Sequence, residues 1–256
     1  MRTSLKVPVI FLSLISLFVL PMRASAQGSK IAFTLAPPPL GFPVSEKPVE
    51  GQKLLYHKLG IGFASIKTDA VDITGFSPTY TMNRVISETS SILFSTSFGV
   101  LKGNKFDLSG VQIPLKLTYS YRVFNSGANT ATLFGGSGAE VLYTTTKVGS
   151  TKTEANLVTV PINLGIQYNR DIGDFIVTPY VTMSQNLNWT SIYINSSTPI
   201  EYDNSWNKGK SFVTTVVGFD ALYKPLNMSL SGLVQSSKDS DVIFFTLSKI
   251  LKSGGS

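Results

Sequence analysis

The segment VQIPLKLTYSYR (residues 111–122) decides the fold, and a similar segment, VTVPINLGIQYN (residues 158–169), follows 47 residues later. In both segments apolar residues alternate with polar or small ones, and Pro114 aligns with Pro161. Alternation over more than ten residues predicts a β-strand with one apolar face and one polar face. Both segments are longer than the ordinary globular strand of about 5–6 residues. A tilted strand that crosses a bilayer needs about 9–11 residues, so the length indicates a membrane protein.

The repeat predicts two antiparallel hairpins, each made of one proline-containing segment and the strand after it. Proline has no backbone N–H group and cannot donate to the hydrogen-bond ladder of a sheet. We therefore expect Pro114 and Pro161 on the polar face, near the middle of two strands that run in the same direction, where the ladder is interrupted or bulged. The alternative is that the two segments share their composition but not their geometry.

The amino terminus has the layout of a secretory signal peptide. Arg2 and Lys6 precede an apolar run at residues 7–20, and Ala24-Ser25-Ala26 follows as a small-residue cleavage site. We expect residues 1–26 to direct Sec-type export, with cleavage following Ala26. The alternative, an uncleaved membrane anchor, fits less well because the apolar run is short for a spanning helix.

The rest of the chain predicts one domain with loose ends. Residues 27–52 are rich in proline and predict an extended linker, residues 53–251 a β-barrel, and residues 252–256 a flexible tail. The sequence holds no cysteine, which excludes disulfides and thiolate metal sites. Loss of residues 1–26 lowers the net charge from +7 to +4, because this segment carries three basic and no acidic residues. Lys and Arg form no cluster in the remainder, so we expect no nucleic-acid partner.

Further segments share the strand-like alternation, whereas helical periodicity is almost absent. Leu59, Ile61 and Phe63 lie on one face of LLYHKLGIGFASIK, and the turn KPLN separates two later strands. The segment around TYTMNRVISE alternates poorly and is the weakest candidate. Together they predict an all-β fold, an antiparallel up-and-down barrel of about ten strands, with eight as the alternative. The other segments are SILFSTSFGVL, TATLFGGSGAEVLYTTT, FIVTPYVTMSQNLNW, SFVTTVVGFDALY, MSLSGLVQS and VIFFTLSKIL.

Alternation alone does not tell which face lines the barrel interior. A secreted soluble barrel would hold its apolar face inside and bind an apolar ligand there, whereas a transmembrane barrel turns that face to lipid. Three features favour the transmembrane arrangement: aromatic residues near strand ends, a polar face rich in Gly, Ser, Thr and Asn, and alternating short and long connections. Short connections are expected at 171–174 and 224–227, and long ones at 147–155 and 192–210. The aromatic residues expected at the membrane interfaces are Tyr121, Tyr143, Tyr168, Trp189 and Tyr223.

The chain resembles the small outer-membrane β-barrel proteins of Gram-negative bacteria. The segments that carry the resemblance are IPLKLTYSY, VPINLGIQY, DIGDFIVTPYV and the closing hairpin GFDALYKPLNMSLSG. The resemblance implies a protein of the cell outer membrane that contacts outer-membrane lipid and lipopolysaccharide and is inserted by the barrel-assembly machinery. Members of this family commonly end on an aromatic residue that this machinery reads. The present chain departs from that pattern, because KSGGS follows its last strand-like segment.

Five charged residues fall on the predicted polar face. The interior of a barrel of about ten strands is narrow, and side chains can largely fill it. Opposite charges buried there must pair, since an unpaired buried charge costs several kcal/mol. We therefore expect ion pairs across the lumen, either as the lining of a narrow solute path or as a plug that holds the barrel shut. The five residues are Lys58, Lys116, Arg122, Glu140 and Asp220.

The sequence offers little for catalysis. Its one histidine, His57, falls on the lipid-facing side near the start of the first strand, and any histidine-dependent chemistry would run through it. No GxSxG, HExxH or phosphate-binding motif occurs. We expect no enzyme and no cofactor, and a structural, surface-interaction or narrow-pore role. The alternatives are the secreted ligand-binding barrel and, third, a lipid-modifying enzyme of the outer membrane.

Residues 191–210 form the longest connection expected late in the chain. They are polar, and they hold Tyr193, Tyr202 and Trp206 among Asn and Ser residues. This composition suits an adaptable recognition surface, although the aromatic residues could equally extend two neighbouring strands above the membrane. We expect this loop to face the cell exterior, where it could bind a surface partner.

Overall fold

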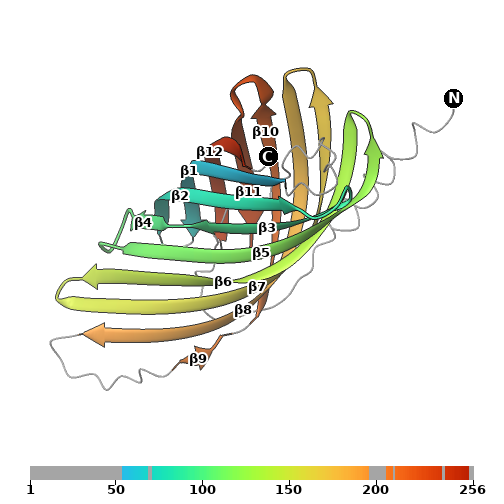
Figure 1. Ribbon diagram of the computed structural model, residues 1–256. Coiled ribbons are helices and arrows are strands. Elements are labelled where there is room, and N and C mark those ends of the chain that lie inside the picture. Colours follow the sequence, from blue (N-terminus) through green and yellow to red (C-terminus); the bar gives the residue numbers. More distant parts are fainter. Residues whose placement is uncertain (1–53, 69–70, 196–205, 210, 238–239, 254–256) are drawn as a thin grey trace.

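The computed structural model describes residues 54–68, 71–195, 206–209, 211–237 and 240–253, most of which belong to one antiparallel sheet (Figure 1). The expected signal peptide and proline-rich linker lie outside the described residues. No helix in the described ranges is long and apolar enough to cross a membrane. The elements are β1 (Leu55–Thr68), β2 (Asp72–Val85), β3 (Ser90–Ser97), β4 (Gly99–Gly103), β5 (Ser109–Ser126), β6 (Asn129–Val148), β7 (Thr151–Ile172), β8 (Phe175–Asn195), β9 (Asn207–Lys208), β10 (Phe212–Tyr223), the 3₁₀ turn η1 (Lys224–Leu226), β11 (Met228–Ser236) and β12 (Ser240–Ser253).

The sheet closes into a barrel because β1 pairs with both β2 and β12. β3 and β4 are two parts of one strand, since each pairs with β2 on one side and with β5 on the other. β9 is two residues long and pairs with the edge of β8. The barrel therefore has ten strands, all in antiparallel pairs. The predicted all-β barrel of about ten strands is confirmed, and the segment around TYTMNRVISE is strand β2.

The faces of the barrel follow the residue alternation. On β7, Leu164 points outward with 65% of its surface exposed, whereas Asn163 beside it points inward and is 8% exposed. Ser, Thr, Asn and Gln together make up about half of the buried residues and share the interior with apolar side chains, whereas large aliphatic and aromatic side chains cover the outside. A soluble barrel with an apolar ligand inside would need the opposite arrangement. That alternative is therefore wrong, and the outer surface is one that suits lipid.

The two prolines lie where the ladder is interrupted, as predicted. Pro114 faces the interior of β5 at the level where β3 gives way to β4, since Thr96 pairs with Leu115 and Gly99 pairs with Gln112. Pro161 faces the interior of β7 beside a gap in the β6–β7 pairing, between the pairs that end at Ile162 and resume at Thr159. The hairpins β5–β6 and β7–β8 thus share their geometry as well as their sequence.

Two ends of the barrel can be distinguished by the chain termini. Leu55 of β1 lies opposite Ser253 of β12, and we name this the terminal end. The tight turns β5–β6 and β7–β8 also lie there, the second built on Gly173 with φ +60°. The opposite end, which holds the β6–β7 and β8–β10 connections, is named the loop end. β12 continues to Ser253, two residues beyond the expected end of the barrel.

Strands β6, β7 and β8 project beyond their neighbours at the loop end (Figure 1). β5 begins opposite Thr145 and β10 begins opposite Asn186, whereas β6 continues to Val148 and β8 to Asn195. The long connection expected at 147–155 is wrong, because a two-residue turn at 149–150 joins β6 to β7. The expected loop at 191–210 begins five residues too early, because β8 continues to Asn195. We name residues 144–148, 151–156 and 191–195 the extension.

Interior aromatic rings lie against glycines of the neighbouring strand. Gly218 of β10 is directly opposite Tyr180 of β8, and a side chain at position 218 would overlap the Tyr180 ring and hydroxyl. Gly165 of β7 is opposite Phe134 of β6 in the same way. The glycines on the polar face therefore make room for large rings inside a narrow barrel.

Candidate functional site

The barrel interior holds a buried ion pair between Lys58 of β1 and Asp220 of β10. The Lys58 Nζ atom lies 2.9 Å from Asp220 Oδ1, and the two side chains are 6% and 3% exposed. Ser231 of β11 donates a second hydrogen bond of 2.6 Å to the same carboxylate oxygen. Lys58 also donates to the Ser231 hydroxyl at 3.4 Å. Lys58 thereby links β1 to β10 and β11, which lie far from it in the sequence. Each charge is hydrogen-bonded, as a buried charge requires.

A second charged group lies on the opposite part of the wall, between β5 and β6. Glu140 accepts a hydrogen bond from Gln112, and it interacts electrostatically with Lys116. Gln112 and Lys116 are its two diagonal neighbours, because Pro114 lies directly opposite Glu140 in the register. Pro114 is small and almost fully buried, so the long side chains on either side of it can both reach the carboxylate. Pro114 thus leaves the space through which Gln112 and Lys116 approach Glu140.

A third polar group crosses β7, β8 and β10. Thr159 donates to Asn188 at 3.0 Å, and Asn186 donates to Thr214 at 3.2 Å. Ser184 donates to Asn163 between them. These side chains are buried and neutral, and each hydrogen bond links two neighbouring strands.

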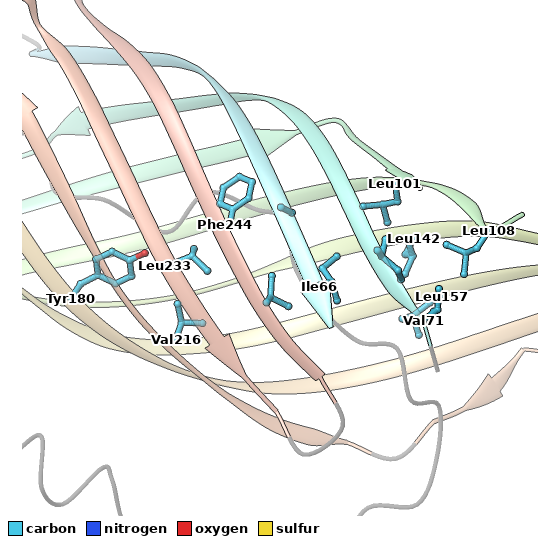
Figure 2. Packing of buried hydrophobic residues seen from close by; sticks show 13 residues of the cluster. Ile66, Val71, Leu101, Leu108, Leu142, Leu157, Tyr180, Val216, Leu233 and Phe244 are labelled. Carbon is cyan, nitrogen blue, oxygen red and sulfur yellow. The ribbon is translucent and has the colours of Figure 1, made fainter. Parts of the chain in front are cut away.

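Two clusters of buried apolar side chains fill the space around these polar groups. One cluster lies at the terminal end. The other lies in the middle and at the loop end (Figure 2). On β1, Lys58 has Tyr56 of the first cluster on one side and Ala64 of the second on the other. On β10, Asp220 lies between Leu222 and Val216 in the same manner. The ion pair is therefore enclosed toward both ends, and packed side chains occupy the interior.

Four of the five predicted interior charges are buried, and the fifth lies at the rim. Lys58, Lys116, Glu140 and Asp220 are each at most 8% exposed. Arg122 is half-buried on β5 at the terminal end, where its backbone N–H donates to Thr89. Its position follows from the bulge between Arg122 and Phe124, which ends the regular part of the strand. Sequence reasoning missed Gln112 and Ser231, because neutral side chains on a polar face carry no signal of which charge they contact.

The five predicted interface aromatics lie on the outer side near the two strand ends. Tyr121, Tyr168 and Tyr223 are at the terminal end, and Tyr143 and Trp189 are at the loop end. On β5, Tyr121 lies 10 residues from Val111, the partner of Tyr143. With a rise of about 3.4 Å per residue and a tilt of about 40°, this spans about 25 Å along the membrane normal, as in outer-membrane barrels. We name the outer surface between the two levels the lipid band.

His57 lies on the outer side of β1 at the terminal end. Its Nδ1 atom is 2.8 Å from the Tyr80 hydroxyl of β2, and the two rings are stacked with centroids 6.0 Å apart. It faces away from the interior groups, so the only imidazole of the sequence cannot act on anything bound inside the barrel. The described residues contain no group of three or more His, Cys, Asp or Glu side chains that could hold a metal ion.

The extension has a different chemistry from the barrel wall. Thr is its commonest residue, followed by Lys, Asn and Ile, and none of the side chains whose burial is described is buried. Lys152 and Glu154 form a salt bridge of 2.6 Å on the outer side of β7. The hydrogen bond and the charge of Lys152 hold the pKa of Glu154 below its ordinary value, and Glu154 in turn raises the pKa of Lys152. Lys147 lies directly opposite Lys152 in the register, so two like-charged residues are neighbours there.

No family model and no curated protein matches the sequence. Among solved structures the chain is similar to the outer membrane protease OmpT from Escherichia coli, with a TM-score of 0.54, 10% identity, and coverage of 84% of this chain and 99% of that one. Weaker likenesses link it to the translocator domain of autotransporter NalP from Neisseria meningitidis (TM-score 0.44, 9% identity, 77% and 87% covered) and to Neisserial surface protein A (0.35, 9%, 78% and 97%). Identities this low bear on the fold alone. The closed ten-stranded barrel, polar inside and apolar outside, has the fold of the outer-membrane β-barrel proteins.

Proposed function

We propose that the protein is an integral barrel of the cell outer membrane with a closed interior, and that it serves as a scaffold which holds the extension outside the membrane. The observation that carries this proposal is the enclosed Lys58–Asp220 pair. A lumen that conducts solutes would keep such charges in contact with water, whereas here both are almost fully buried between two apolar clusters. The plug is thus favoured over the narrow solute path.

The extension is the part that we propose for surface interaction. The first and last strands of the barrel, β1 and β12, begin and end at the other end, so a barrel with this end in the periplasm would direct the extension toward the cell exterior. Exposed Tyr193 and Ile192 stand among Thr, Ser and Asn side chains there, a composition that suits recognition by adaptable polar contacts. The lipid band would contact outer-membrane lipid and lipopolysaccharide, and insertion would use the barrel-assembly machinery.

A catalytic role has less support. OmpT is named as a protease, but the likeness to it extends to the fold only. His57 is at the terminal end and on the lipid side, about one membrane thickness from the extension. We therefore propose a protein without histidine-dependent catalysis and without a cofactor.

Conductance of the refolded full chain in a planar lipid bilayer tests the closed interior. The wild-type protein should insert without steady current steps. A variant that empties the interior, Tyr180→Ala with Phe244→Ala, should fold and show discrete steps, because it removes two of the largest fully buried side chains. Regular conductance steps from the wild type would contradict the plug.

Labelling of intact cells tests which end faces outward. The chain has no cysteine, so single substitutions can be read without background. Val148→Cys in the extension should react with a membrane-impermeant maleimide on intact cells, because Val148 is 58% exposed. Ala128→Cys, in the exposed β5–β6 turn at the terminal end, should react only after the outer membrane is permeabilised. The reverse pattern would mean that the barrel is inserted the other way up.

A further inference from the structure

One residue of the lipid band does not suit contact with lipid. Gln185 lies on the outer side of β8 and is exposed, and its amide makes no hydrogen bond within the described residues. Its neighbours across the register are Ile162 of β7 and Val213 of β10, both apolar. An amide carries two donors and an acceptor with two lone pairs. Hydrocarbon offers no partner for any of them, so exposure to acyl chains is unfavourable.

The depth of Gln185 excludes a contact with lipid headgroups. It precedes Trp189 by four residues on β8, which corresponds to about 10 Å along the membrane normal for a rise of about 3.4 Å and a tilt of about 40°. Leu187 is the one outward residue between them, so the glutamine side chain is too short to reach the interface. Thr215 of β10 is the diagonal neighbour of Gln185 and also lies on the outer side. Two polar side chains therefore share one place within the lipid band.

Resting on the proposed membrane location, we propose that Gln185 marks an interface within the membrane, and that its occupant is a second copy of this chain. The amide is self-complementary: across a two-fold axis each carboxamide donates to the carbonyl oxygen of the other, which satisfies both groups with one residue type. The flanking side chains suit such a contact, because Ile162 and Val217 are 53% and 54% exposed and form apolar shoulders on either side of β8. Amide side chains that hydrogen-bond across protein contacts stabilise association in membranes.

The geometry also limits the contact to a small area. β8 is tilted in the wall, and its two-fold copy crosses it at an angle, so the two strands meet closely at one point. A hydrogen-bonded pair at that point fixes the relative position of the two barrels. Because β8 continues into the extension, the extension of each copy would then lie beside that of the other copy outside the membrane.

The test uses the full chain refolded in phosphatidylcholine vesicles, with heat-modifiable migration on gels as the measure of folding. Donor- and acceptor-labelled wild-type proteins should show energy transfer that falls as lipid is added in excess. Gln185→Leu should fold and lower the association constant roughly tenfold. This is the size expected when side-chain hydrogen bonds between two membrane-embedded segments are lost. Met183→Leu, on the same strand and face, should leave the association constant unchanged because it removes no polar group.

Disulfide cross-linking tests separately which position of the barrel lies at the contact between the two copies. Gln185→Cys should form a disulfide-linked dimer under mild oxidation, since two-fold symmetry places position 185 opposite itself. Phe76→Cys, exposed on β2 on the far side of the barrel, should not. A wild-type monomer at every protein-to-lipid ratio, or equal cross-linking at positions 76 and 185, would overturn the dimer. Failure to insert into vesicles at all would instead contradict the proposed membrane location.

Discussion

Strands β6, β7 and β8 pass through two environments, and their sequences change where they leave the first. Within the lipid band the outer face is mainly apolar, with side chains such as Leu164 outside and Asn163 inside. In the extension β6 and β7 carry mainly polar residues on both sides, whereas β8 carries Ile192 and Ile194 on its inner side, and none of the side chains described there is buried. Hydrogen bonding between the strands is continuous through both parts. The backbone ladder therefore does not need alternation; the alternation reflects what lies on each face.

Two ion pairs also differ with their environment. Among those of the described residues, they are the two that differ most in burial. Lys58–Asp220 in the interior is 2.9 Å long with side chains 6% and 3% exposed, and Lys152–Glu154 in the extension is 2.6 Å long with side chains 52% and 30% exposed. A buried pair that loses one partner leaves an uncompensated charge, whereas water replaces the lost partner of an exposed pair. Similar distances thus imply very different consequences of substitution.

The largest effect is expected at Asp220. Asp220→Ala leaves the Lys58 ammonium buried with Ser231 as its one remaining side-chain hydrogen-bond partner among the described residues, and should lower the free energy of unfolding by about 3–5 kcal/mol. Urea unfolding of the refolded protein, followed by tryptophan fluorescence, measures this. Glu154→Ala is the matched variant in the extension and should leave the unfolding midpoint unchanged.

A double substitution sharpens that result. Lys58→Met combined with Asp220→Leu replaces the pair with apolar side chains and should regain most of the lost stability, because the desolvation of both charges is removed as well. Equal losses for Asp220→Ala and Glu154→Ala would show that the interior pair is hydrated, and would contradict the packed lumen.

The next largest loss of stability is expected for a charge placed on the outer face of the barrel. Leu164→Arg places a charge within the lipid band and should cost about 2–4 kcal/mol, with slower insertion into vesicles. Thr145→Arg, on the outer side of β6 in the extension, should change stability by less than about 0.5 kcal/mol, as most surface substitutions do. Folding yields in vesicles of the two variants measure the difference. Normal insertion of Leu164→Arg would place position 164 outside the hydrocarbon.

A smaller effect is expected where glycine makes room for an interior ring. Gly218→Ala would push against the Tyr180 ring and hydroxyl and against a backbone oxygen of β11, and should cost about 1–3 kcal/mol as an overpacked substitution. Adding Tyr180→Phe should recover part of this loss in a thermal unfolding experiment. The Tyr180 hydroxyl has no hydrogen-bond partner among the described residues, so its removal should itself cost little. No recovery would mean that the backbone contact alone sets the cost.

The difference between the lipid band and the extension also decides what could be predicted from the sequence. Strands inside the lipid band were recognisable because lipid outside and packed polar groups inside impose alternation, and the buried charges followed from the same period. The extension was misjudged at residues 147–155 and 191–195, because an exposed strand does not need regular alternation, and a short or largely polar strand resembles a loop in sequence. The partners of Glu140 could not be predicted either, since the diagonal contacts with Gln112 and Lys116 depend on the strand register.

The smallest effect is a shift in titration within the extension. Lys152 lowers the pKa of Glu154, first through a hydrogen bond and then through its charge, and Tyr143 contributes a further hydrogen bond. A carboxyl group whose pKa is lower in the folded than in the unfolded state contributes its stability above the unfolded pKa, and loses it as the pH falls through the folded value. The contact should therefore persist at neutral pH and break only below the ordinary range of a glutamate. Carbon-13 NMR of the Glu154 carboxyl should show its pKa rising in Lys152→Gln, while the unfolding midpoint at neutral pH stays unchanged because water screens both groups. An unchanged pKa in that variant would mean that Lys152 does not remain beside Glu154 in solution, and that the extension holds no lasting ion pair comparable to the one in the barrel.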